Sequence, residues 1–408
     1  MINTTISKNT SLDLLNEYQA GATFFFASPN CTMLAEGINT IVHQDQIEKI
    51  PELIAEVLND VKQKGHPNPV IVGAFPFDGD KGVKLIVPQE YRIAERLQFD
   101  FKSQTQNASF AMEYNMESVP SPQEYMEGVQ KGVEAIKKGD LKKIVLSRSL
   151  NIVPSEKIDI QKLLYNLALH NKHGYTFAVD LHHSEKTEKN SLSQRTLMGA
   201  SPELLVSKSG AQVISNPLAG SRPRSKDPIE DKRRADELLS SPKDLHEHAV
   251  VIEAVAEALR PYCHTLHVPE KPSLVNSETM WHLSTEIKGE LIDNSVSSLE
   301  LALALHPTPA VCGTPTDKAR KAIKKIEPFD REFFTGMLGW NDINGDGEWI
   351  VTIRCAEVED NSLRLFAGAG IVAESRPEDE LAETRAKFRT MLGALGLNDE
   401  SLEGKLEG

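Results

Sequence analysis

Two residues of this sequence are suited to acid–base chemistry: a lysine that opens an apolar run and a glutamate in a turn. Lys143 begins the apolar part of KKIVLSR, where strand alternation places it on the face opposite Lys142. One of the two is expected to point inward, and burial helps an ammonium lose its proton and act as a base. A solvated strand-end lysine explains the pattern equally well. Glu203, in GASPELLV, is either a turn carboxylate or a general acid.

Three acidic residues on two helix-forming segments could bind a divalent cation. Glu380, Glu383 and Lys387 lie at i, i+3 and i+7, so they share one helix face, close to an apolar side of the same helix. Glu247 falls on the edge of another apolar stripe, where a partly buried carboxylate requires a cation or a donor. The carboxylates suit a Mg²⁺ ion that bridges protein and substrate. The alternative is a solvated, charge-paired helix surface.

Two further motifs point to other ligands but lack the necessary context. DLHEH at 244–248 has histidines two positions apart, not the i, i+4 pair of a zinc protease helix. FAGAGIVAES formally satisfies GxGxxA with Gly368, Gly370 and Ala373, but few residues follow and Pro377 interrupts a helix. We therefore expect neither zinc nor a dinucleotide. The small residues still allow an anion to approach backbone N–H groups.

Composition excludes several classes of function. The chain has 408 residues, with 45 Lys and Arg against 59 Asp and Glu, for a net charge of −14. Nucleic acids and anionic membrane surfaces need clustered basic residues, so neither is an expected partner. The four cysteines form no CxxC pair, the first 16 residues lack an apolar signal region, and no apolar run approaches a membrane span. These features predict a soluble cytoplasmic protein.

The elements that must position these residues can be read from periodicity and caps. The first hundred residues have a strand-and-turn texture with a helix near 46–62, and a polar stretch at 103–122 marks a boundary. Capped helices are predicted at 121–139, from Ser241 to about 259, and at 377–395. Strands are predicted at 143–146, 349–355 and 363–366, and a hairpin loop at 182–194. We predict an N-terminal part (1–118), a catalytic region (119–397) and a tail (398–408).

Nine blocks occur in an order typical of one enzyme family. The chain resembles the chorismate-utilising enzymes, and most of all their isochorismate synthase branch. The amino-terminal TFFFASPN also resembles that branch. The blocks run from about residue 120 to 397 and read KKIVLSR, LMGASPELLV, NPLAGSRPR, DLHEHAVVIEAV, MWHLSTEIKGEL, LALHPTPAVCG, PFDREFFTGMLGWND, GEWIVTIRCAEV and LFAGAGIVAES with ELAETRAK.

The resemblance implies a fold and a set of site residues. It implies an α+β fold of two large packed antiparallel sheets flanked by helices, whereas strand–helix alternation alone would favour a parallel sheet. It implies Mg²⁺ held by Glu247 and Glu383, with Glu380 and Asp244 in an outer shell. It further implies a substrate site in which backbone groups receive the ring carboxylate and cations receive the pyruvyl carboxylate, made of Gly220, Ser221, His282, Ala310, Arg354, Gly368 and Lys387.

Individual residues distinguish the branches of the family. Aminodeoxychorismate synthases carry a nucleophilic lysine at the position of Ala219, anthranilate synthases a glutamine at that of Lys143, and salicylate synthases tend to carry threonine at that of Ala310. The resemblance thus implies an isomerase, with Lys143 as base for water attack at C2 and Glu203 as acid for the leaving C4 hydroxyl. It implies chorismate as substrate, no amidotransferase subunit and a possible downstream isochorismatase.

Alternatives stay open at this level. A salicylate or anthranilate synthase would act as a lyase and release pyruvate, and an isochorismate synthase could serve menaquinone rather than 2,3-dihydroxybenzoate and siderophore synthesis. A catalytically silent binding protein on the same scaffold is disfavoured because every proposed acid, base and ligand position holds a competent residue.

Overall fold

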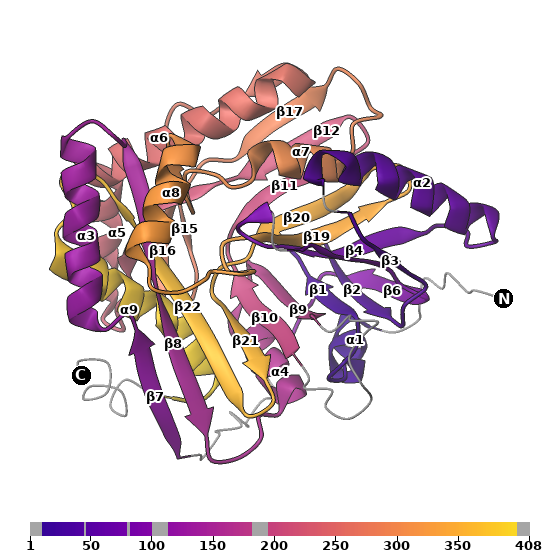
Figure 1. Cartoon of the computed structure of the whole chain (residues 1–408), viewed down its shortest axis with the longest axis horizontal. Helices are drawn as coiled ribbons and strands as arrows, with labels where there is room; N and C mark the ends of the chain where they lie inside the picture. Colours follow the sequence, from indigo (N-terminus) through magenta and orange to yellow (C-terminus); the bar gives the residue numbers. More distant parts are fainter. Residues whose placement is uncertain (1–9, 45, 80–81, 100–112, 182–194, 398–408) are drawn as a thin grey trace.

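The fold consists of two large antiparallel sheets and one small sheet. The computed structural model describes residues 10–44, 46–79, 82–99, 113–181 and 195–397 (Figure 1). The predicted loop at 182–194 and the tail at 398–408 lie outside the described residues. Within these ranges every strand pairing is antiparallel, so the resemblance predicted the sheets correctly and a parallel sheet is excluded.

The first large sheet has ten strands and carries the predicted base. Its long strand β8 lies near one end of the sheet and pairs with β22, and an extra strand, β7 (Tyr114–Val119), also pairs with β8. The order along the sheet is β18 (Gly313–Thr314), β8 (Lys143–Pro154), β22 (Ser362–Ile371), β21 (Cys355–Glu359), β10 (Arg195–Ser201), β9 (Tyr175–Asp180), β1 (Phe24–Ala27), β2 (Cys31–Glu36) and β6 (Glu90–Glu95).

The second large sheet has nine strands, and the small sheet has three. The nine-stranded order is β14 (Cys263–His267), β17 (Ile287–Leu291), β12 (Gln212–Asn216), β11 (Leu204–Ser209), β20 (Gly347–Val351), β19 (Met337–Asp342), β4 (Val70–Phe75), β5 (Lys84–Val87) and β3 (Thr40–Val42). The small sheet contains β13 (Leu218–Pro223), β16 (Met280–Ser284) and β15 (Ser273–Asn276). Buried side chains of both large sheets form one shared core that includes Phe26, Phe177, Val72 and Ile350.

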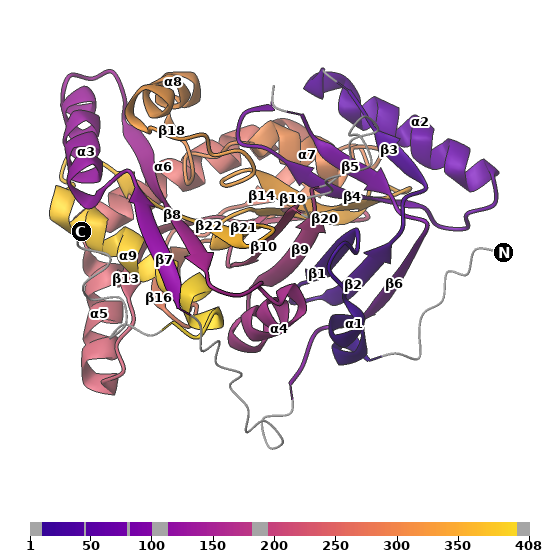
Figure 2. The same cartoon turned by 60° about the horizontal axis from the view of Figure 1, so that its bottom comes forward.

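Helices cover the outer faces of the sheets. Figure 2 shows α9 lying along α3 beside β22. A core cluster joins α1, α4 and α9 to the ten-stranded sheet, and another joins α2, α6 and α7 to the nine-stranded sheet. The helices are α1 (Ser11–Glu17), α2 (Ile50–Gln63), α3 (Pro122–Lys137), α4 (Ile160–His170), α5 (Pro228–Ser240), α6 (Pro242–Leu259), α7 (Ser298–Leu305), α8 (Thr316–Ile326) and α9 (Pro377–Ala394), with short 3₁₀ turns at Ile47–Lys49 and Arg260–Tyr262. None of the described helices is long and apolar enough to span a membrane.

Local signals placed the four predicted helices correctly, and α1, α4, α5, α7 and α8 were not predicted. Ser121 and Glu124 form the predicted capping box of α3, and the Ser241 side chain accepts a hydrogen bond at the start of α6. The predicted strand at 349–355 is wrong in its bounds. β20 ends at Val351 and β21 begins at Cys355, because the chain leaves the nine-stranded sheet there and joins the ten-stranded one.

A second crossover between the sheets lies beside the first. β10 ends at Ser201 in one large sheet, and β11 begins at Leu204 in the other. The Ser201 hydroxyl donates to the Val351 carbonyl at 2.7 Å, and the Ala200 amide donates to the Arg354 carbonyl at 3.0 Å. Glu203 and Arg354 therefore both lie where the backbone passes from sheet to sheet.

Candidate active site

One cavity gathers most of the predicted site residues. Its walls come from the ten-stranded sheet, the small sheet, α6, α9, the loop before β18 and the segments that connect the two large sheets. Among its lining residues are Glu203, Gly220, Ser221, Glu247, His282, Ala310, Arg354, Gly368, Glu383 and Lys387. Lys143 and Glu380, the remaining two predicted residues, do not line the cavity and lie directly behind it.

Lys143 contacts the cavity through Glu247. Lys143 is fully buried and Lys142 is exposed, as strand alternation predicted. The Lys143 Nζ lies 2.9 Å from Glu247 Oε1, although this ion pair lacks hydrogen-bond geometry. Gly370 makes this approach possible, because a Cβ there would lie 2.1 Å from Glu247 Oε1 and 3.0 Å from Lys143 Cε. The glycine run thus belongs to β22 and admits side chains rather than a nucleotide.

Glu203 is a buried acid on the other side of the cavity. Its side chain is 3% exposed, and burial raises the pKa of its carboxyl to about 7. The nearest donor is the Leu218 amide, 3.5 Å from Glu203 Oε1, which only weakly opposes this shift. Near neutral pH the group therefore carries its proton part of the time, which suits a general acid.

Arg354 is a buried cation without an acidic partner. It is 4% exposed, and no carboxylate of the described residues lies within ion-pair distance of its guanidinium. Its backbone has a φ of 51°, a conformation that costs a non-glycine residue energy and marks functional sites. Burial lowers the pKa of Arg354 to about 10. A buried guanidinium in this state is prepared for an anionic ligand.

His282 accepts a hydrogen bond from this arginine. The Arg354 Nη2 lies 3.2 Å from His282 Nε2, and because a guanidinium can only donate, Nε2 is the acceptor. Burial, together with the charges of Arg354 and Lys387, holds the pKa of His282 well below its usual range. The ring is therefore neutral and orients Arg354 without adding charge.

Lys387 and Glu383 form the third side of the cavity. Lys387 Nζ lies 2.7 Å from Glu383 Oε1 and donates to the Gly368 carbonyl at 2.7 Å. Ser221 Oγ donates to the same carboxylate oxygen at 2.9 Å. Burial opposes ionisation of Glu383, but Lys387 and these donors lower its pKa. Gly220, next to Ser221, has a φ of 80°, so the turn that presents this segment requires glycine.

Glu380 lies one turn before Glu383 on α9 and pairs with Lys243, a residue that was not predicted from the sequence. Burial and the Glu383 charge raise the pKa of Glu380 to about 7, and Lys243 lies 2.5 Å from it. Lys243 precedes Glu247 by four residues on α6, so helical spacing could have placed it near that carboxylate but could not have identified Glu380 as its partner. Asp244, predicted in the outer shell, pairs instead with Arg222 at 2.6 Å.

The zinc motif has a structural role. His246 is exposed, whereas His248 is buried between the Ala219 carbonyl (3.1 Å) and Thr285 Oγ1 (2.8 Å). Burial lowers the pKa of His248 to about 4, so it is a neutral link that holds the segment with Gly220. In the described part of the chain, no three His, Cys, Asp or Glu side chains converge as a preformed metal cluster.

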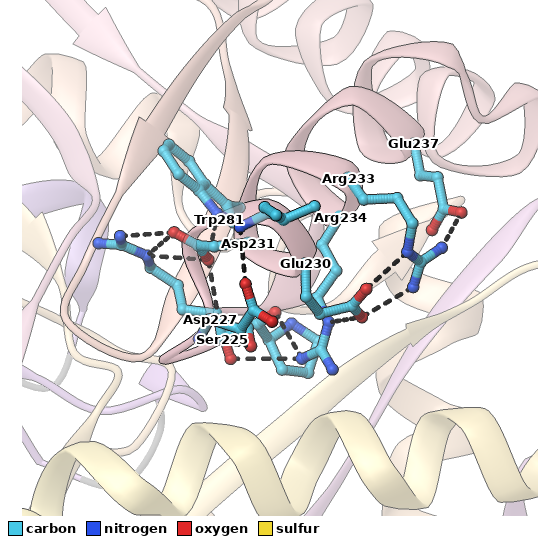
Figure 3. A network of polar contacts seen from close by, with 11 residues as sticks. Ser225, Asp227, Glu230, Asp231, Arg233, Arg234, Glu237 and Trp281 are labelled. Carbon is cyan, nitrogen blue, oxygen red and sulfur yellow. Dashed lines mark hydrogen bonds and ion pairs between the residues drawn. The ribbon is translucent and has the colours of Figure 1, made fainter.

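The small sheet is clamped to α5 beside the cavity. Asp231 accepts hydrogen bonds from Arg224 (2.7 Å), the Ser225 amide and the Trp281 indole (both 2.9 Å) (Figure 3). The Arg224 guanidinium also lies over the Trp281 ring. A larger hollow lined by Arg224 shares Pro202 and His282 with the cavity and therefore adjoins it.

Comparisons with known proteins agree with this geometry. Residues 87–396 match the family model described as chorismate binding enzyme. The chain is 60% identical over 397 residues to isochorismate synthase DhbC of Bacillus subtilis, covering 96% of this chain and 98% of that protein. It is 37% identical over 382 residues to isochorismate synthase EntC of Escherichia coli, covering 92% and 95%.

A solved structure gives the same result. The crystal structure of DhbC from Bacillus anthracis, assigned as a 2,3-dihydroxybenzoate-specific isochorismate synthase, superposes with a TM-score of 0.90 at 67% identity, covering 95% of this chain and all of that one. The family model covers most of the chain and the relatives align over nearly their whole length. The chain therefore belongs to the chorismate-binding enzyme family.

Proposed function

We propose that this chain is an isochorismate synthase, an isomerase that converts chorismate reversibly into isochorismate. One observation carries the proposal: a single cavity places a glutamate of pKa about 7 and a buried, unpaired arginine together, with a buried lysine directly behind its wall. The relatives at 60% and 37% identity are isochorismate synthases, which supports the same activity.

The cavity has two regions suited to the two carboxylates of chorismate. Arg354, Lys387 and the backbone at Gly368 would receive the pyruvyl carboxylate, since no carboxylate of the described residues lies within ion-pair distance of Arg354. The backbone of Gly220 and Ser221 would face the ring carboxylate. His282 and Ala310 would line the ring between them.

Lys143 and Glu203 would divide the proton transfers. Lys143 would accept a proton from the water that attacks C2, and Glu203 would protonate the C4 hydroxyl as it leaves. In the reverse direction each group would take the other role.

The donor set fits a divalent metal ion. Isochorismate synthases are metal-dependent as a family, and we propose Mg²⁺ for this chain. Glu247 and Glu383 line the same cavity, and each of them, like Glu380, is balanced by a lysine: Lys143, Lys387 and Lys243. Mg²⁺ is bound in many enzymes by one or two carboxylates plus substrate and water. Glu247 and Glu383 would hold the ion, Glu380 would support it, and the ion would neutralise and anchor the ring carboxylate.

Product analysis tests the activity. Purified protein incubated with chorismate and Mg²⁺ should yield isochorismate, separated by chromatography, without pyruvate. EDTA should stop the reaction and added Mg²⁺ should restore it. Stoichiometric pyruvate together with an aromatic product would instead establish a lyase of the salicylate or anthranilate synthase type.

A matched pair of lysine variants tests the assignment of the base. Lys143→Ala should abolish turnover and retain chorismate binding by calorimetry, because Lys143 lies behind the cavity wall. Lys142→Ala, at the exposed residue directly before β8, should keep wild-type turnover. Near-wild-type turnover by Lys143→Ala would exclude it as the base.

The related structure favours 2,3-dihydroxybenzoate synthesis as the pathway. The Bacillus anthracis protein is assigned as specific for 2,3-dihydroxybenzoate. We propose that this chain likewise supplies isochorismate to an isochorismatase on the way to a catechol siderophore, without an amidotransferase subunit. Loss of 2,3-dihydroxybenzoate, with menaquinone levels unchanged, is expected when the gene is deleted from its host.

A further inference from the structure

We propose that Arg331 is a positioning residue that holds together the cavity wall on the side of Lys143 and Ala310. The inference rests on the proposed function. Arg331 lies outside the cavity, is 3% exposed, and would not touch the substrate. Its effect on the reaction would pass through the residues to which it donates hydrogen bonds.

The acceptors of Arg331 belong to three separate segments of the wall. Its Nη2 donates to the Val145 carbonyl at 2.8 Å, and its Nη1 donates to the Val311 carbonyl at 2.8 Å and to Thr335 Oγ1 at 3.3 Å. Val145, Val311 and Thr335 all line the cavity. One guanidinium therefore connects β8, the loop before β18 and the segment before β19.

Glu327 fixes the orientation of this guanidinium. Arg331 Nε donates to Glu327 Oε2 at 2.8 Å, and Nη2 lies 2.5 Å from Oε1. The same Oε1 accepts the Ser147 amide at 2.8 Å. Both side chains are almost fully buried, so neither water nor salt can replace these bonds.

Arg331 and Glu327 take the place of a backbone partner along part of the edge of β8. β18 contains only Gly313 and Thr314, which pair with Ile144 and Lys143, and the Cys312 carbonyl accepts the Val145 amide. Between that point and Ser149, where the pairing with β7 begins, this edge of β8 has no partner among the described strands. Within this gap, Arg331 donates a hydrogen bond to the Val145 carbonyl, and Glu327 accepts one from the Ser147 amide.

Arg331 can affect the reaction because two of its acceptors are close in sequence to residues with proposed roles. Val145 is two residues from Lys143 on β8, so both side chains point to the same side of the strand. Val311 adjoins Ala310, the residue expected to face the substrate ring. Loosening the Arg331 bonds would let the strand of the base and the Ala310 loop move independently, and misplacement by about 1 Å can cost roughly 100-fold in rate.

Arg331→Lys is the main test. Lysine keeps the positive charge beside Glu327, but a single ammonium cannot reach the Val145 and Val311 carbonyls with the planar fork of arginine. We expect kcat for isochorismate formation to fall about 10- to 100-fold, with KM within twofold of wild type. Hydrogen exchange should accelerate in peptides that contain Val145 and Ser147.

Two further variants separate positioning from stability. Lys208→Met breaks an ion pair between a buried lysine and the partly exposed Asp346, at 2.7 Å, and neither residue lines the cavity. It should lower the melting temperature and leave kcat at wild type. Glu327→Asp shortens the side chain by one methylene, which draws the carboxylate away from Arg331, and it should lower kcat several-fold. If Arg331→Lys does not fold, this variant tests the positioning role in its place.

The outcomes are distinguishable. Unchanged kcat in a folded Arg331→Lys or Glu327→Asp protein would overturn the inference, as would an equal loss of kcat in Lys208→Met. A rise in KM at constant kcat would also overturn it, because that result indicates substrate binding rather than positioning. Failure of the proposed function would appear separately, as a wild-type protein that forms no isochorismate.

Discussion

The active-site cavity and the outer side of α5 are both rich in charged side chains, but they differ in how these side chains form ion pairs. On α5, Glu230 pairs with Arg233 and Arg234, and Arg233 also pairs with Glu237 (Figure 3). These side chains are between 30% and 55% exposed. In the cavity, Arg354 is buried without an acidic partner, and Glu203 is buried without an ion pair among the described residues.

Two glutamates show what this difference does. Hydrogen bonds and charge from Arg233 and Arg234 lower the pKa of Glu230 to about 2. Burial raises the pKa of Glu203 to about 7. The same side chain is therefore a permanent anion on the surface helix and a proton donor in the cavity, so environment rather than residue type assigns the chemistry.

The largest effect is expected from removing the proton donor. Glu203→Gln keeps the shape of the side chain and should reduce kcat by about 10²- to 10⁴-fold. In the wild type the donor form is lost above a pH of about 7, so the forward rate should decline there. A kcat profile from pH 5.5 to 9 measures both. A variant with more than a tenth of wild-type activity would exclude Glu203 as the acid.

The second-largest effect is expected from replacing Arg354, which has no acidic partner among the described residues. Arg354→Met should lower kcat/KM for chorismate by about 10²-fold or more, because charge-assisted bonds to a buried carboxylate are worth roughly 2–3 kcal/mol. Arg233→Met, on the matched surface network, serves as the control and should retain wild-type kcat/KM. Similar losses in both variants would mean that the two regions do not differ as proposed.

Burial of the Glu203 carboxyl should also lower the free energy of unfolding at higher pH. The folded pKa of Glu203 lies above its unfolded value of 4.5, so the folded protein holds this proton more tightly. Stability is thus highest below pH 4.5 as far as this group is concerned, and is lost as pH rises to about 7. At pH 8, Glu203→Gln should therefore raise the unfolding free energy by roughly 1–3 kcal/mol. Denaturant titrations at pH 5 and 8 test this, and a gain of equal size at both values would contradict it.

The smallest effect is expected on the surface helix. Glu237→Ala removes one partner of Arg233, which keeps Glu230. Exposed pairs of this kind contribute little, so the unfolding free energy should change by less than about 0.5 kcal/mol. Thermal melts at low and high salt provide the measurement, and a loss above about 1 kcal/mol would show that the network behaves like a buried one.

Prediction from the sequence succeeded where signals are local. The i, i+3, i+7 spacing placed Glu380, Glu383 and Lys387 on one face of α9, and alternation placed Lys142 and Lys143 on opposite faces, only one of them buried. It failed where partners come from distant segments. Arg222 as the partner of Asp244 and Lys243 as that of Glu380 depend on how α6 lies against β13 and α9, which no local pattern specifies.

The sequence by itself determined four of the nine described α-helices, the caps of α3 and α6, and the types of residue available for acid–base chemistry, because periodicity and capping act within a few residues. The tertiary structure alone decided the state of those residues. Glu203 and Arg354 are separated by some 150 positions, yet they face one cavity because two adjacent backbone crossovers carry the chain between the sheets there. Burial at that junction removes water from both groups, and this desolvation gives the glutamate its raised pKa and leaves the arginine to bind an anion.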